Sequence, residues 1–189
     1  MKNKMTPLGE EFFHRNCDKV AEELVGKLII RKTEDGELVL RITETESYGG
    51  EEDTACHAHK GRTQRTEVLY RHGGTLYVYL CYGIHHLLNI VTGPVGSPQA
   101  VLIRACVDAE GPGRLTRRLQ IEKDAFNRQE LNGNDALRLE DDGQRFEIVP
   151  RPRVGIGYAA IEDQQRLWRF CMGRRLPDAT GTEDSPFEE

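Results

Sequence analysis

Three β-rich runs joined by short turns constrain the fold of this chain more than any other feature of its sequence. The runs lie at 75–81, 86–92 and 99–107, and Gly and Pro residues separate the last two. Strands joined by so few residues pair antiparallel, because a parallel connection needs a crossover of about a dozen residues or more. The sequence therefore predicts an antiparallel sheet with a hairpin over residues 75–92.

Further elements extend and cover the predicted sheet. Strands are predicted at 27–32, 38–48, 136–139 and 146–149. Apolar residues recur at helical spacing over 8–25, a second helix begins at Gly111-Pro112 and runs to Ile121, and a short third helix falls within 122–135. The predicted fold class is α+β: a single mixed domain with a curved antiparallel sheet flanked by helices, and a protruding β-hairpin.

The length and the two ends of the chain predict its domain organisation and its location. The chain has 189 residues, which is the length of one domain. We expect that domain over 1–175, followed by an acidic, flexible tail over 176–189. No apolar run approaches the roughly 20 residues of a membrane-spanning helix, and the N-terminus lacks the apolar segment of a secretory signal. We therefore expect a cytoplasmic protein that avoids the membrane, nucleoid-associated if the source is prokaryotic.

Positive charge is concentrated in one region, although the net charge of the chain is −5. Residues 55–118 contain eight Lys or Arg and three acids, so this segment carries +5 and the rest carries −10. Local charge governs contact with a polyanion. The segment therefore favours a nucleic-acid partner, with a merely solvated surface as the alternative. It includes much of a long, polar and glycine-rich loop at 49–74, and a loop of that length is more often functional than accidental.

Two glutamates within one predicted strand are candidates for acid–base chemistry. Strand alternation places Ile42, Glu44, Glu46 and Tyr48 on one face. Burial beside apolar groups, or beside each other, would raise the pKa of at least one carboxyl, which suits a general base. The alternative is an edge strand with a wet face. Arg104 lies inside an apolar run, where an arginine needs a carboxylate partner, and either glutamate would serve.

An aromatic residue and a group of metal-binding side chains also need an explanation. Tyr82 falls at the tip of the predicted hairpin, where its own domain buries it poorly, so it is a candidate wedge between stacked bases. Cys56, His57 and His59 could begin a metal site, but no second pair of ligands follows at a normal spacing. We therefore expect no metal, and we expect the five cysteines to be reduced thiols.

The ordered motifs of the chain resemble those of the alkyladenine (3-methyladenine) DNA glycosylase family over about residues 8–175. The matching segments are Glu44-Thr45-Glu46-Ser47-Tyr48, Glu52-Asp53 leading to His57, the run Gly74–Tyr79, Tyr82-Gly83, Asn89, Val101-Leu102-Ile103-Arg104, Gly111-Pro112 with Leu115-Thr116, and Arg153-Val154-Gly155-Ile156-Gly157. The resemblance implies a monofunctional enzyme of base excision repair. Such an enzyme removes alkylated or deaminated purines, such as 3-methyladenine, hypoxanthine and ethenoadenine, from damaged double-stranded DNA. It hydrolyses the N-glycosidic bond without cofactor or metal, and we expect a monomer.

The resemblance also implies which residues carry the chemistry and which hold the DNA backbone. Glu46 matches the catalytic glutamate that activates water. Arg104 matches an arginine that helps to hold this water, and the carbonyl of Val154 matches a third water contact. Arg62 and Arg65 align with a basic loop near the phosphates.

A second set of matching residues surrounds the flipped base in that family. Tyr48, His57 and Tyr79 match the aromatic walls between which the base stacks. Asn89 matches a residue that sterically disfavours the exocyclic amino group of guanine, and Tyr82 matches the residue inserted into the duplex in place of the base.

Two rival functions are weaker interpretations of the same residues. A glycoside or nucleoside hydrolase would use Glu44 and Glu46 as a carboxylate pair, but it leaves the basic loop and Tyr82 unexplained. A non-enzymatic nucleic-acid-binding module would use the aromatic side chains as stacking platforms. It leaves Glu46 and Arg104 unexplained, because a carboxylate in a phosphate-facing groove weakens binding.

Overall fold

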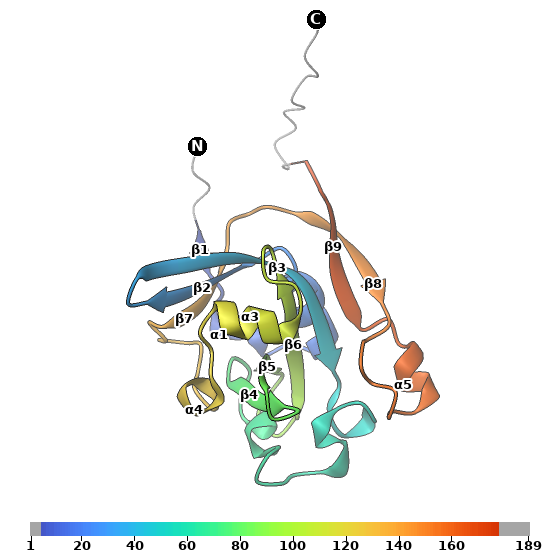
Figure 1. The fold of residues 1–189 in the computed structure, drawn as a ribbon. Helices are drawn as coiled ribbons and strands as arrows, with labels where there is room; N and C mark the ends of the chain where they lie inside the picture. Colours follow the sequence, from blue (N-terminus) through green and yellow to red (C-terminus); the bar gives the residue numbers. More distant parts are fainter. Residues whose placement is uncertain (1–4, 178–189) are drawn as a thin grey trace, which may run out of the picture.

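Antiparallel pairing organises the chain from its first strand to its last, as the short turns predict. A computed structural model describes residues 5–177, and the nine strands in that range form one open sheet (Figure 1). Every pair of neighbouring strands is antiparallel. The strands are β1 (Thr6–Pro7), β2 (Leu28–Thr33), β3 (Gly36–Tyr48), β4 (Leu76–Cys81), β5 (His85–Thr92), β6 (Gln99–Cys106), β7 (Leu137–Asp141), β8 (Phe146–Arg151) and β9 (Arg169–Arg175). The predicted α+β class is confirmed.

The long strand β3 passes through the interior of this sheet. The strand order is β1-β7-β2-β3-β6-β5-β4, and β9 pairs with both β3 and β8. The first half of β3 pairs with β2, whereas its second half lies between β6 and β9. Glu44 and Glu46 belong to that second half, so the alternative of an edge strand is wrong.

The helices are short, and they differ from the prediction in two places. They are α1 (Glu10–Phe13), α2 (Cys17–Leu24), α3 (Pro112–Arg118), α4 (Lys123–Phe126) and α5 (Ile161–Gln165). The single helix predicted over 8–25 is interrupted, because Asn16 caps α2 by accepting a hydrogen bond from the amide of Asp18 at 3.3 Å. The helix α5 was not predicted from the sequence.

The two faces of the sheet are covered differently. On one face, α2 and α3 pack against β3, β5 and β6, and their apolar residues share the main core with alternate residues of the strands. The other face is covered by the loop at 49–74, which forms the 3₁₀ helices η1 (Gly50–Glu52), η2 (His57–Lys60) and η3 (Glu67–Tyr70). Tyr77 and Tyr79 of β4 point to this second face, whereas Leu76 and Val78 point to the first, as alternation predicts.

Two sequence predictions remain, on membrane-spanning helices and on the C-terminal tail. Within residues 5–177, no helix is both long and apolar enough to cross a membrane. The predicted acidic tail at 176–189 falls, from residue 178 onward, outside the described residues.

Candidate active site

A β-bulge in β3 decides which side chains share a face with Glu46. The pairing of β3 with β6 shifts between Ile42 and Thr45, as an extra residue in one strand requires. Ile42 packs in the core under the helices, and the Thr45 hydroxyl on the same side donates to a backbone carbonyl of α2 at 2.7 Å. Glu44 and Glu46 face the opposite way. The prediction that Ile42 shares their face is therefore wrong, because the bulge interrupts strict alternation.

Glu46 is a fully buried carboxylate with a polar partner on each oxygen. Its exposed fraction is 0%. Oε1 accepts a hydrogen bond from the backbone amide of Val154 at 2.8 Å, and Oε2 accepts one from the Tyr48 hydroxyl at 2.9 Å. Burial raises the pKa of Glu46, and this outweighs the lowering effects of Arg104, the Val154 amide and the Tyr48 hydroxyl. The arrangement holds one carboxylate in place with a raised affinity for a proton.

Arg104, on β6, links the two glutamates as the sequence predicts. Its Nε lies 3.0 Å from Oε1 of Glu44, and its Nη1 lies 3.7 Å from Oε1 of Glu46. Glu44 also accepts a hydrogen bond from Nη1 of Arg169 at 2.8 Å. Two guanidinium groups therefore hold Glu44, whereas Glu46 has one more distant cation. The environments of the two carboxylates differ, as separate roles require.

A buried ion pair between Asp53 and Arg153 supports the groups that contact Glu46. Asp53 and Arg153 are 1% and 0% exposed at their side chains, and their two bonds measure 2.6 and 2.9 Å. The Arg153 guanidinium lies 4.9 Å from the centre of the Tyr48 ring. Val154, whose amide contacts Glu46, is the next residue along the chain. The pair therefore holds both hydrogen-bond donors of Glu46 in place.

An aromatic pocket of about 40 Å³ lies beside the carboxylate. Tyr48 connects the two, because it lines the pocket and donates its hydroxyl hydrogen to Glu46. The structure brings all four predicted pocket residues together here. The lining is Tyr48, Ala55, Cys56, His57, Leu69, Tyr77, Tyr79, Asn89, Ala100 and Tyr158.

The rings of His57 and Tyr79 meet edge to face to form part of one wall. Their centres lie 4.7 Å apart at an angle of 71°. His57 is oriented by Tyr77, because its Nδ1 lies 2.9 Å from the Tyr77 hydroxyl. Burial lowers the pKa of His57 to about 4, with a smaller effect from Arg65. The imidazole is therefore neutral near pH 7, and it offers a planar surface without charge.

Asn89 projects from β5 into the same pocket and is held by backbone groups. It is 4% exposed, and its Nδ2 donates to the carbonyls of Tyr77 at 3.2 Å and Leu87 at 3.4 Å. Because both contacts hold its amide, a ligand would meet a fixed side chain at this point.

Tyr82 lies outside the pocket at the tip of the β4–β5 hairpin. It is 92% exposed, and its neighbours Leu80 and Ile84 are 43% and 70% exposed. Its φ of 50° lies in the left-handed region, which a non-glycine residue adopts only at some cost. The tip therefore presents three apolar side chains to solvent on a tight turn.

The two predicted backbone-binding arginines lie in different surroundings. Arg62 is exposed, pairs with Glu67 at 3.3 Å and lies over the ring of Tyr70. Arg65 lies 5.3 Å from the ring centre of Tyr79, at the edge of the pocket. Arg65 thus lies beside an aromatic residue of the pocket, and its assignment to the DNA backbone stays a prediction.

The sequence profile of a family described as methylpurine-DNA glycosylase matches residues 11–108 and 107–175. A relative from Borreliella afzelii (strain PKo), named "Putative 3-methyladenine DNA glycosylase", is 45% identical over 174 residues, which cover 85% of this chain and 93% of the relative. Proteins of the same name from Natranaerobius thermophilus and Methanocella arvoryzae are 39% and 38% identical, over 87% and 92% of this chain and 94% and 98% of their own. The chain belongs to the methylpurine-DNA glycosylase family.

Membership of the methylpurine-DNA glycosylase family confirms the resemblance drawn from the sequence and the enzyme class expected from it, a DNA N-glycosylase. No role was predicted from the sequence for Tyr77, Tyr158, Arg169 or the pair of Asp53 and Arg153. The last two are 100 positions apart, so no local spacing signals their contact. The only available signal was that both fall within segments that resemble this family.

Proposed function

We propose that this glycosylase binds a flipped purine in the aromatic pocket and hydrolyses its N-glycosidic bond with a water molecule activated by Glu46. The substrates would be alkylated or deaminated purines in duplex DNA, and the product an abasic site. One observation carries the proposal: Tyr48 both lines the pocket and bonds to the buried Glu46 carboxylate at 2.9 Å. A base stacked on Tyr48 would place its sugar carbon near that carboxylate.

The chemistry of the bond suits this carboxylate. Departure of the base builds positive charge at the anomeric carbon, which a fixed carboxylate stabilises. The same group accepts a proton from the attacking water, and a raised pKa improves it as a base. We assign Arg104 and the Val154 carbonyl to holding this water.

The pocket and the hairpin account for selectivity in this proposal. Stacking against Tyr48, His57 and Tyr79 contributes about 1–3 kcal/mol per base and favours electron-poor rings. Damaged bases cost less to unstack than normal ones. The fixed Asn89 would exclude the exocyclic amino group of guanine. Tyr82 would fill the vacated site in the duplex.

A panel of duplex oligonucleotides tests the proposal directly. Each carries one 3-methyladenine, hypoxanthine, ethenoadenine or normal purine, and abasic sites are scored as alkali-induced breaks. We expect release of at least one modified base and none of the normal bases. Activity on free nucleosides that equals activity on DNA would favour a nucleoside hydrolase instead, and binding without release would favour the stacking module.

The rate of base release should fall at acidic pH because Glu46 must be ionised to act as a base. Below the raised pKa of Glu46, the single-turnover rate should drop about tenfold per pH unit. His57 titrates only near pH 4, so it stays neutral over most of this range. Rates measured from pH 4.5 to 8 on one lesion check this, and a rate that rises toward pH 4.5 would exclude Glu46 as the base.

Replacing Tyr82 by Ser should weaken binding to lesion DNA. Loss of one stacked aromatic ring costs about 1–3 kcal/mol, or roughly 5- to 150-fold in Kd. The matched control is Val95→Ser. Val95 is also exposed, at 73%, but it lies in the β5–β6 connection. Fluorescence anisotropy of labelled duplexes gives both affinities. Equal affinities for Tyr82→Ser and the control would mean that Tyr82 is only a surface aromatic residue.

A further inference from the structure

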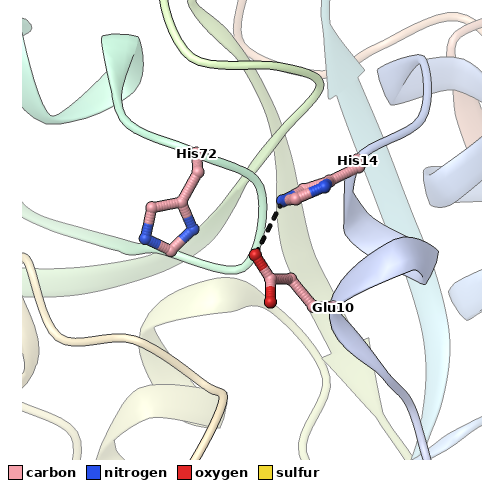
Figure 2. A group of neighbouring side chains, drawn as sticks. All are labelled: Glu10, His14 and His72. Carbon is pink, nitrogen blue, oxygen red and sulfur yellow. Dashed lines mark ion pairs between the residues drawn. The ribbon is translucent and has the colours of Figure 1, made fainter.

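Three side chains that could bind a metal ion converge on the surface, away from the pocket. Glu10 lies on α1, His14 follows the end of that helix, and His72 lies in the connection before β4. One ligand atom from each lies within 4.8 Å of the others, and Figure 2 shows the three side chains around one common space. Oε1 of Glu10 lies 3.3 Å from Nε2 of His14. None of the three lines the aromatic pocket.

One ring nitrogen of His72 contacts a carboxylate, because its Nε2 lies 3.0 Å from Oε1 of Glu130. Nδ1 is therefore the nitrogen that a metal would bind, in place of the contact that it makes now. A histidine that binds a metal almost always donates its other ring hydrogen to a carboxylate or carbonyl, which fixes the ring and makes it a better ligand. Nδ1 also lies 3.0 Å from the Gly73 carbonyl oxygen, a contact that a metal would replace.

The backbone holds the two ligand-bearing segments against each other. The carbonyl of Phe13, beside His14, accepts a hydrogen bond from the amide of Gly93 at 2.9 Å. A Cβ atom at Gly73, beside His72, would lie 2.2 Å from that same carbonyl oxygen, so only glycine fits there. The ligands therefore extend from two segments in close backbone contact. Only their side chains need to move.

We propose that Glu10, His14 and His72 bind one Zn²⁺ ion at this surface, with water as the fourth ligand and Glu130 supporting His72. Two imidazoles and one carboxylate form a donor set that suits Zn²⁺ and does not suit Mg²⁺ or Ca²⁺, which prefer oxygen. Tetrahedral ligands about 2.1 Å from zinc lie about 3.4 Å apart. The ligand atoms lie within 4.8 Å of one another, so no separation has to close by more than about 1.4 Å, which rotation of exposed side chains can supply.

The proposed site is separate from the catalytic chemistry, for which the sequence analysis expects no metal. Closely spaced ligands are what marks a metal site in a sequence, whereas these ligands span positions 10 to 72. Bound zinc would join α1 to the connection before β4, so its effect would be on stability.

Titration of the chelator-treated full chain with ZnCl₂ alone tests this site. Titration calorimetry measures zinc binding, and scanning calorimetry measures the melting temperature. We expect one equivalent to bind and the melting temperature to rise. His14→Ala and His72→Ala should each weaken binding at least about tenfold, and Glu130→Gln should weaken it about 10- to 100-fold. His59→Ala is the matched control, because this exposed histidine lies beside Cys56 and His57.

Cobalt provides a second measurement that identifies the ligands. Co²⁺ bound by nitrogen and oxygen gives visible d–d bands without the thiolate charge-transfer absorption of cysteine ligation. No zinc binding by the folded wild type would overturn the proposal. So would undiminished binding in the His14→Ala/His72→Ala double variant, loss of binding in His59→Ala alone, or thiolate absorption.

Discussion

Replacing Glu46 by Gln should abolish base release while leaving binding of lesion DNA intact. Loss of a general base costs about 10²- to 10⁴-fold in rate, and loss of a charge that stabilises the transition state costs more. The fold should tolerate the change. The amide oxygen can accept from Val154, and the amide nitrogen can donate to the Tyr48 oxygen. Single-turnover release and anisotropy with the same duplex measure the two effects.

Two further variants make this result specific. Glu140→Gln is the matched control, because Glu140 is also buried, at 7% exposed, but lies on β7 and pairs with Arg138. Its activity should equal that of the wild type. Glu44→Gln distinguishes this mechanism from that of the rival glycoside or nucleoside hydrolase, since a retaining carboxylate pair would need both glutamates equally. Residual release by Glu46→Gln within tenfold of the wild type would remove Glu46 from the mechanism.

Replacing Asp53 by Asn should destabilise the protein by about 3–5 kcal/mol, because it leaves the buried Arg153 guanidinium without a counter-charge. Asp53 also accepts hydrogen bonds from the amides of Gly49 and Ala55 at 3.0 Å each, which order the start of the 49–74 loop. For a chain of this size, the melting temperature should fall by about 6 to 20 °C. Thermal unfolding monitored by circular dichroism measures the change.

The control for this variant lies in the same loop. Glu52→Gln removes an exposed carboxylate and should shift the melting temperature by no more than about 2 °C. If Asp53→Asn unfolds within 2 °C of the wild type, the pair does not hold the site together. Because the pair positions Tyr48 and Val154, a folded Asp53→Asn should also release the base more slowly at saturating DNA.

Local features of the sequence were enough to predict the hairpin and the strands joined by short turns. Features that depend on long-range pairing were predicted poorly. Runs joined by short turns predicted β4, β5 and β6 to within a residue or two, because turn length alone decides antiparallel pairing. Strand β9 was not predicted, because its seven residues include three arginines and little apolar alternation. It becomes a strand by pairing with β3 and β8.

The same distinction between local and long-range features applies to the candidate site. The sequence by itself determined that the chain is a methylpurine-DNA glycosylase family member with an exposed Tyr82 and a glutamate on a strand, because these depend on ordered motifs and local turns. Only the tertiary structure decided that Glu46 is fully buried, that Asp53 meets Arg153, and that Glu10, His14 and His72 converge. The physical reason is that burial and ion pairing depend on which faces pack together, and a bulge or a distant loop changes that without any local signal.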